Sequence, residues 1–144
     1  MGVIFLASYS DQQKRALIMD HYLNPRFREE TLVADTHTYY QHSSACVDQI
    51  WLQYNPPTCH YKATGCAIFL SACDIFIERL HEVGWSQRRA LVAAFQALVH
   101  QATLTPGQLA LLGKLQIYAN VKRHLNRMEC ALLITQVLNQ IPRD

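Results

Sequence analysis

The sequence lacks any long hydrophobic run. None of its 144 residues belongs to a stretch of 18 apolar residues, the length at which a helix can cross a membrane. The apolar segment near the start, GVIFLAS at residues 2–8, is short and has no basic flank before it, so it does not fit a secretory signal. We therefore expect a cytoplasmic protein that makes no use of a membrane.

The sequence also lacks an excess of charge of one sign. Its 13 basic and 11 acidic side chains leave a net charge of +2 and a pI near 8.3, which is too mild to indicate a nucleic-acid partner. No repeat, low-complexity segment or linker interrupts the chain. Half of the residues are apolar, so the sequence predicts one domain over residues 1–144 with a substantial core.

A close-set cysteine pair is missing as well. The five cysteines are far apart, at positions 46, 59, 66, 73 and 130, and their number is odd. An odd count in a cytoplasmic chain argues against a disulfide framework. It points to reduced thiols, some of which bind metal or carry sulfur.

Strand signals come early in the chain and helix signals come late. Residues 30–40 and 46–54 are rich in Thr, Val, aromatic and alternating side chains, and a proline turn at 55–58 leads to a third short strand at 59–64. One helix is expected before them, from Ser10-Asp11 to Asn24-Pro25. This order predicts an α+β fold, with a small antiparallel sheet of about three strands and helices packed on one face.

Four helices are expected after the strands. An apolar helix opens at Gly65-Cys66 and ends at Gly84, and a second begins with a serine cap at Ser86. Thr105 followed by a proline predicts the start of a third helix, which would continue to about residue 125. The last helix is expected over residues 126–141.

Four side chains in separate parts of the sequence could form a metal site. On a strand, Cys46 and Asp48 would point to the same face. Cys66 stands at the opening of a helix, where the positive end of the helix dipole favours a thiolate, and Cys130 stands near the start of another helix with Arg127 one turn before it. Three thiolates and one carboxylate suit a tetrahedral zinc site or an iron–sulfur cluster.

A simpler interpretation stays open for each cysteine. Free cysteines are often just small buried apolar residues. Cys73, two helical turns after Cys66 in an apolar run, fits a core position, whereas Cys59 at the hairpin tip is expected to be solvated. The seven histidines do not cluster at metal spacing and are expected mostly at the surface or at helix ends.

The motifs together resemble the NifU N-terminal-domain family of iron–sulfur cluster assembly proteins. The stretch ALIMDHYLNPRFRE resembles the opening helix motif of that family, ACVDQIW its first cysteine and nearby aspartate, GCAIFLSAC its second cysteine, and RMECALL its third. The resemblance extends over almost the whole chain. It implies that Cys46, Asp48, Cys66 and Cys130 are the metal ligands.

Two differences place the resemblance on the SufU-like rather than the IscU-like side. The position before the third cysteine is Glu129 instead of the histidine of the IscU-like branch, and VKRHLNR stands in place of the Leu-Pro-Pro-Val-Lys chaperone motif. The long gap between Cys66 and Cys130 supplies the extra helical sequence of SufU-like proteins. One further departure is Val47, where the family has glycine; we expect the valine to add bulk beside the metal.

The resemblance implies a zinc-bound sulfur acceptor. Such a protein takes persulfide sulfur from a cysteine desulfurase and passes it to downstream iron–sulfur assembly proteins. It is a sulfur-transfer partner rather than a stand-alone enzyme. Cys46 is expected to accept the sulfur, and Arg127 to face the partner. A scaffold that assembles a 2Fe–2S cluster, or holds iron, on the same ligands is the alternative. Two further hypotheses for the function are a structural zinc protein that mediates contacts and a metal-free helical adaptor.

Overall fold

A computed structural model describes residues 9–44, 46–119, 121 and 125–142 of the chain. The order of elements along the chain is α1 (Asp11–Leu23), β1 (Thr38–His42), β2 (Gln49–Asn55), β3 (Thr58–Thr64), α2 (Ala67–Val83), a 3-10 turn η1 (Trp85–Gln87), α3 (Arg88–Val99), α4 (Pro106–Leu112), a 3-10 segment η2 (Gly113–Tyr118) and α5 (Leu125–Leu138).

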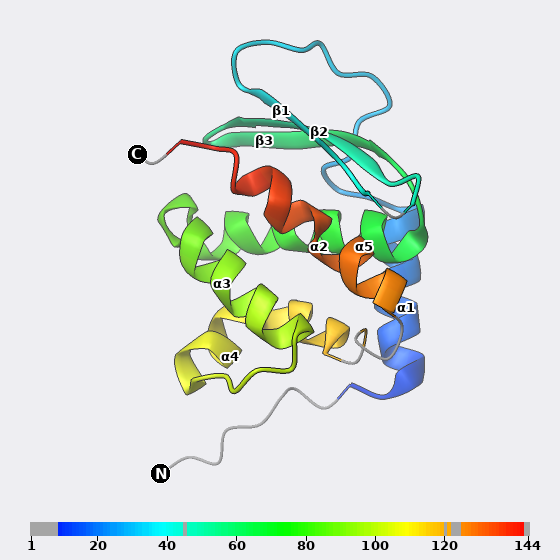
Figure 1. Cartoon of the computed structure of the whole chain (residues 1–144), viewed down its shortest axis with the longest axis vertical. Coiled ribbons are helices and arrows are strands. Elements are labelled where there is room, and N and C mark those ends of the chain that lie inside the picture. The colour runs from blue at the N-terminus through cyan, green and yellow to red at the C-terminus, as the bar shows by residue number, and fades with distance from the viewer. Residues whose placement is uncertain (1–8, 45, 120, 122–124, 143–144) are drawn as a thin grey trace.

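The three strands form one antiparallel sheet in the order β1-β2-β3, and the helices lie on one side of it (Figure 1). Along β2 the side chains alternate as the sequence pattern requires: Ile50, Leu52 and Tyr54 are buried against the helices, while the residues between them face the other way. The α+β prediction, with about three strands and one helical layer, is therefore confirmed.

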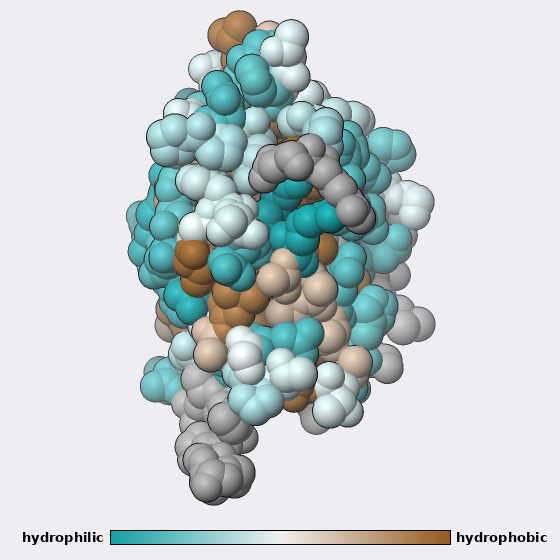
Figure 2. Space-filling view, turned by 90° about the vertical axis from the view of Figure 1, so that its left-hand side faces the viewer, coloured by the Kyte–Doolittle hydropathy of each residue, from teal (hydrophilic) through white to brown (hydrophobic). Residues whose placement is uncertain are grey.

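Helix α2 is the centre of the helical layer. It contacts α1 on one side and α5 on the other, and its residues from Phe69 to Ile77 are all buried. Cys73 lies fully buried in this run, as expected for a core residue. None of the helices in the described part of the chain is long and apolar enough to span a lipid bilayer. Figure 2 shows one face of the molecule, where polar side chains surround a limited apolar area.

Several helix boundaries follow from the local signals. The Ser10 hydroxyl accepts a hydrogen bond from the Gln13 amide, and the Gln13 side chain accepts one from the Ser10 amide, which makes a capping box at the start of α1. Thr105 starts α4 in the same way, and Gly84 ends α2. These three predictions are confirmed.

The first strand and the cap at Ser86 are predicted wrongly. Of the predicted segment 30–40, only residues 38–40 pair with β2, and β1 continues to His42. The carboxylate of Asp35 accepts the amide of His37 and holds a turn just before the strand. Ser86 lies inside the 3-10 turn η1, and its position is not a helix cap. Helix α3 begins at Arg88 without a side-chain cap.

The helix predicted from Thr105 to about residue 125 ends early. It stops at Leu112, because Gly113 has φ +52° and because Arg79 of α2 forms hydrogen bonds with carbonyl groups in the last turn of the helix. The Arg79 guanidinium donates to the carbonyl oxygens of Leu111 (2.7 Å) and Ala110 (3.0 Å). A side chain from another helix thus decides this boundary. The end of the predicted helix, with most of the basic stretch at 121–124, lies outside the described residues, as does the apolar segment 2–8.

Candidate metal centre

Cys46 lies in the loop between β1 and β2, not on a strand as expected. The loop is closed by the Ser43 amide, which donates to the Asp48 carbonyl at 2.9 Å, and by the Cys46 amide, which donates to the Ser43 hydroxyl at 3.2 Å. The Cys46 side chain is exposed. The loop therefore holds this thiol at the surface of the molecule.

Asp48 precedes the first residue of β2, and its carboxylate is almost fully buried, with 1% of the residue exposed. Its Oδ1 accepts the backbone amide of Cys66 at 2.9 Å, and its Oδ2 lies 3.7 Å from the Cys66 sulfur. The carboxylate thus bridges the β1–β2 loop and the start of α2. A buried carboxylate at a helix N-terminus is stabilised by the free amide groups and the dipole there.

Cys66 is the N-cap residue of α2. Its sulfur accepts the amide of Phe69 at 3.5 Å, and the residue has the extended backbone typical of a cap. The side chain is exposed on its other side. The predicted placement of Cys66 at the opening of the apolar helix is confirmed.

Gly65 makes the close approach of Asp48 to Cys66 sterically allowed. A Cβ atom at this position would lie 2.2 Å from Asp48 Oδ1 and 2.7 Å from the ring of Phe69, and the backbone has φ +154°. No other residue fits both the space and the conformation. The Gly-Cys pair in the sequence is therefore a geometric requirement of the site.

Cys130 lies on α5 and is buried, with 5% exposed. Its sulfur is 3.9 Å from the sulfur of Cys46. Burial raises the pKa of the Cys130 thiol, and the neighbouring side chains of Asp48 and Cys66 raise this pKa further. The expectation that the helix start and Arg127 favour the Cys130 thiolate is therefore wrong for the protein without metal. A coordinated cation would favour the thiolate, because thiols bound to metal ions lose their proton.

The structure brings the four predicted side chains together. Ligand atoms of Cys46, Asp48 and Cys130 all lie within 4.8 Å of one another. Cys66 is outside this group of three and adjoins it through the contact of its sulfur with Asp48 Oδ2, at 3.7 Å. Two sulfurs on one tetrahedral zinc are about 3.8 Å apart, and a sulfur and an oxygen about 3.6 Å, given the usual bond lengths. The measured 3.9 Å and 3.7 Å are close to these separations. The donor types fit a zinc ion, and these two separations are close to those of a tetrahedral site.

Two departures from the family pattern have a structural explanation. Val47 is 85% exposed and points into solvent, so it does not crowd the site; the expectation that it adds bulk beside the metal is wrong. Glu129 accepts a hydrogen bond from the Ser44 hydroxyl at 3.3 Å. At this position the side chain ties α5 to the Cys46 loop.

The other sequence predictions near the site have mixed outcomes. Cys59 is buried under the sheet, and burial raises its pKa to about 12, so the expectation of a solvated thiol is wrong. A position at the tip of a hairpin does not reveal which face of the sheet the helices cover, and Cys59 points to the covered face. Arg127 is exposed on α5, one turn before Cys130, and its role toward a partner stays a prediction.

A buried histidine was missed by the sequence reasoning. The Nδ1 atom of His21 lies 2.7 Å from the carboxylate of Asp74, and both side chains are fully buried. Asp74 also accepts the backbone amides of Arg26 and Phe27 and the Tyr61 hydroxyl. This cluster fixes the chain after α1 against α2 and β3. Its partners are far apart in the sequence, so periodicity gave no signal for it.

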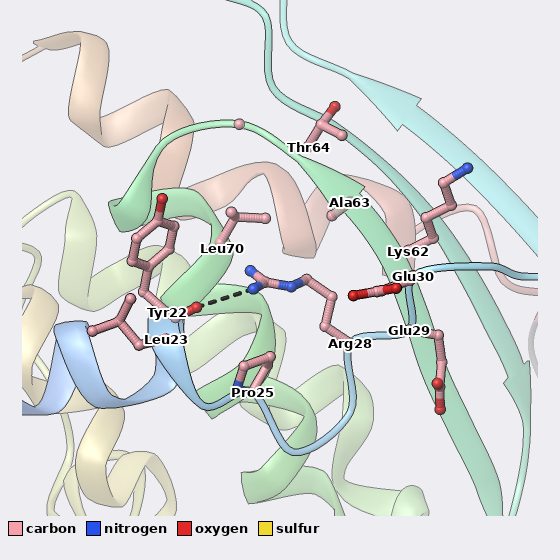
Figure 3. A pocket seen from close by; sticks show the side chains of 11 residues that line it. Tyr22, Leu23, Pro25, Arg28, Glu29, Glu30, Lys62, Ala63, Thr64 and Leu70 are labelled. Atoms are coloured by element: carbon pink, nitrogen blue, oxygen red, sulfur yellow. Dashed lines mark hydrogen bonds between the residues drawn. The ribbon is translucent and has the colours of Figure 1, made fainter.

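A groove of about 720 Å³ borders the site on the side of α1 (Figure 3). It is lined by the C-terminal end of α1, the segment after it, the end of β3 and the start of α2. Its rim carries charges of both signs, including Arg28 and Lys62 with Glu29 and Glu30. Gly65 is part of the wall, so the groove ends next to the Asp48–Cys66 contact.

The comparisons with known proteins identify the fold. Neither a family profile nor a curated protein matches the sequence. Solved structures do match: the chain has the fold shared by NifU-like and SufU-type proteins, as the resemblance implied.

Three solved structures illustrate the match. A hypothetical protein aligns with a TM-score of 0.77 at 19% identity, over 91% of this chain and 97% of that one. A putative iron–sulfur cluster assembly scaffold protein for the SUF system from Fervidobacterium islandicum AW-1 aligns with 0.73 at 18%, over 92% and 94%. The N-terminal part of a nitrogen-fixing NifU-like protein from Brucella abortus aligns with 0.66 at 14%, over 86% and 88%.

Proposed function

We propose that this chain is an iron–sulfur cluster assembly protein of the SufU-like type, which holds zinc and accepts persulfide sulfur from a cysteine desulfurase. The observation that carries the proposal is the convergence of three thiols and one carboxylate from three separate parts of the chain. The shared fold with a putative assembly scaffold of the SUF system supports it. Downstream iron–sulfur assembly proteins would receive the sulfur.

Cys46, Asp48, Cys66 and Cys130 would hold the zinc ion. The bound ion supplies positive charge that keeps the thiols deprotonated at neutral pH. Asp48 positions the centre, because its buried carboxylate is fixed by the Cys66 amide. Glu129 and Ser44 hold the Cys46 loop against α5.

Cys46 is the residue best placed to accept sulfur. Its thiol is exposed on a loop, whereas Cys130 is buried and the Cys66 sulfur is engaged as a helix cap. The Cys46 thiolate attacks the outer sulfur of the persulfide on the desulfurase. A new sulfur–sulfur bond forms at Cys46, the bond within the partner's persulfide breaks, and the partner's cysteine leaves as a thiolate.

The test combines metal analysis with sulfur transfer. Protein purified without added metal is expected to be colourless and to contain one zinc per chain. With a cysteine desulfurase and cysteine, the wild type should gain a persulfide, detected as one added sulfur by mass spectrometry, and Cys46→Ala should not. Cys59→Ser is the matched control, since it changes a thiol away from the centre. Equal sulfur uptake by Cys46→Ala would refute the assignment.

A scaffold for a 2Fe–2S cluster is the second candidate, and the described role of the Fervidobacterium protein favours it. The same four ligands would serve, and a carboxylate is a weaker cluster ligand than a thiolate, which favours later release of the cluster. In that case the purified protein would be brown and contain iron and sulfide in place of zinc. Elemental analysis with visible absorbance separates the two candidates.

A further inference from the structure

The centre contains two sulfur atoms that differ in accessibility although they are close together. Cys46 and Cys130 are separated by 84 positions in the sequence, and their sulfurs are 3.9 Å apart. Cys46 is on an exposed loop, and Cys130 is on the buried face of α5. An exposed thiol backed by a buried second thiol is the arrangement of a reactive cysteine with a resolving partner.

We propose that Cys46 and Cys130 form a reversible disulfide when a hydroperoxide oxidises Cys46, and that this bond releases the metal ion. The disulfide rests on the geometry of the two cysteines alone. The release of metal rests on the proposed function, since it requires that the centre holds zinc.

The chemistry needs one peroxide per bond. The Cys46 thiolate attacks a peroxide oxygen, which converts the thiol to a sulfenic acid and reduces the peroxide to water or an alcohol. The Cys130 sulfur then attacks the sulfenic sulfur, the sulfur–sulfur bond forms, and the sulfur–oxygen bond breaks. The oxygen leaves as water, which takes up the Cys130 proton. Two thiols are oxidised in total, and two electrons pass to the peroxide. An external dithiol restores both thiols by exchange.

The approach of the two sulfurs requires only local movement. A disulfide is about 2.05 Å long, so the sulfurs must move about 1.9 Å closer. The Cys46 side chain is exposed and can rotate without displacing core residues.

The other thiols are poorer partners for Cys46. The Cys66 sulfur faces the Asp48 carboxylate and accepts the Phe69 amide, so pairing with Cys46 would remove a helix cap. Cys59 and Cys73 are buried away from this loop, under the sheet and inside α2. Cys130 is therefore the partner that the geometry favours for Cys46. The Cys66 side chain also lies beside Cys130, so the test below distinguishes the two pairs.

The loss of two ligands explains the coupling to metal release. A disulfide sulfur is no longer a thiolate, and zinc in a four-ligand site binds thiolates. Only Asp48 and Cys66 would remain, which is too few for a stable zinc site. Oxidation would thus switch off the centre without unfolding the helices.

The test uses the whole chain, reduced and stripped of metal by a chelator, and then treated with hydrogen peroxide. The wild type should lose two hydrogens in intact mass, and digestion should give one linked pair of peptides containing Cys46 and Cys130. Dithiothreitol should reverse the change. Cys130→Ser should give instead a Cys46 sulfenic acid that dimedone traps, while Cys66→Ser, the matched control, should still form the disulfide.

A linked pair of Cys46 with Cys66, or of Cys66 with Cys130, would overturn the proposal. Over-oxidation of Cys46 to sulfinic acid with Cys130 still free would also overturn it. A second arm uses zinc-loaded protein and a chromogenic zinc chelator, and expects one zinc released for each disulfide. Zinc that stays bound after the disulfide forms would overturn the release step. Failure of sulfur transfer from a desulfurase would leave both arms readable, because neither uses a desulfurase.

Discussion

Replacing Gly65 by alanine should damage the metal centre and the start of α2 together. The new Cβ atom would lie 2.2 Å from Asp48 Oδ1 and 2.8 Å from its carboxyl carbon, which is closer than any stable contact. Asp48 must therefore move, and its 2.9 Å hydrogen bond from the Cys66 amide is lost. A substitution at a position that is not itself a proposed ligand would thus displace the proposed ligand Asp48.

The expected magnitude has two parts. Placing a residue with a side chain at a positive φ costs about 1–3 kcal/mol. Losing a hydrogen bond to a buried carboxylate costs about another 1.5–3 kcal/mol. For a chain of this length, a change of 1 kcal/mol shifts the melting temperature by about 2–4 °C. We expect zinc affinity to fall at least roughly 10-fold, the lower end of the effect of disturbing the support of a metal ligand.

Two other glycines provide matched controls. Gly84 has φ +100° and nothing within 4 Å of the added Cβ, so Gly84→Ala tests backbone strain without a collision. Gly107 has an ordinary φ and only a 3.9 Å contact with Thr105, so Gly107→Ala should be neutral or slightly stabilising. Zinc affinity is measured by chelator competition and stability by thermal melting. The reasoning is refuted if Gly65→Ala keeps wild-type zinc affinity and melts no lower than Gly84→Ala.

Three further predictions follow from burial. In native protein without metal, iodoacetamide at pH 8 should modify the exposed Cys46 quickly and the buried Cys59 very slowly. The reason is that burial raises the pKa of Cys59 to about 12. Equal modification rates, measured by peptide mass spectrometry, would contradict this. His21→Ala should lower the free energy of unfolding by about 1.5–3 kcal/mol in denaturant melts, because it removes one hydrogen-bond partner of the buried Asp74 carboxylate, which keeps the Arg26 and Phe27 amides. Chelator competition should show unchanged zinc affinity. Val47→Gly should change stability by only about 0.5 kcal/mol and leave zinc affinity at the wild-type value, and a marked change in affinity would mean that Val47 faces the metal.

Local signals predicted the parts of the fold that local physics decides. The caps at Ser10 and Thr105, the helix start at Cys66 and the end at Gly84 each depend on hydrogen bonds or backbone angles within a few residues. Such signals can be read from a short window of sequence. The end of α4 cannot, because the side chain of Arg79 comes from a helix more than 30 positions earlier.

The four proposed ligand positions come from the resemblance rather than from spacing. Their separations follow no metal-binding pattern, and the strand placement given to Cys46 was wrong. What the sequence could not supply is how the loop, α2 and α5 come together. The His21–Asp74 pair was not predicted for the same reason, since its members are 53 positions apart.

The carboxylate of Asp48 connects the stability of the fold to the chemistry of the centre. One of its oxygens accepts the amide of Cys66, the N-cap residue of α2, and the other faces the Cys66 sulfur. Cys130 is buried on α5, and Cys66 is held as the N-cap of α2, whereas Cys46 is on an exposed loop. The candidate centre therefore combines two thiols held by helices with one thiol on a loop. A partner can therefore reach the Cys46 sulfur while the two thiols held by helices keep their place, which is the property that a sulfur acceptor needs and that a purely structural zinc site does not.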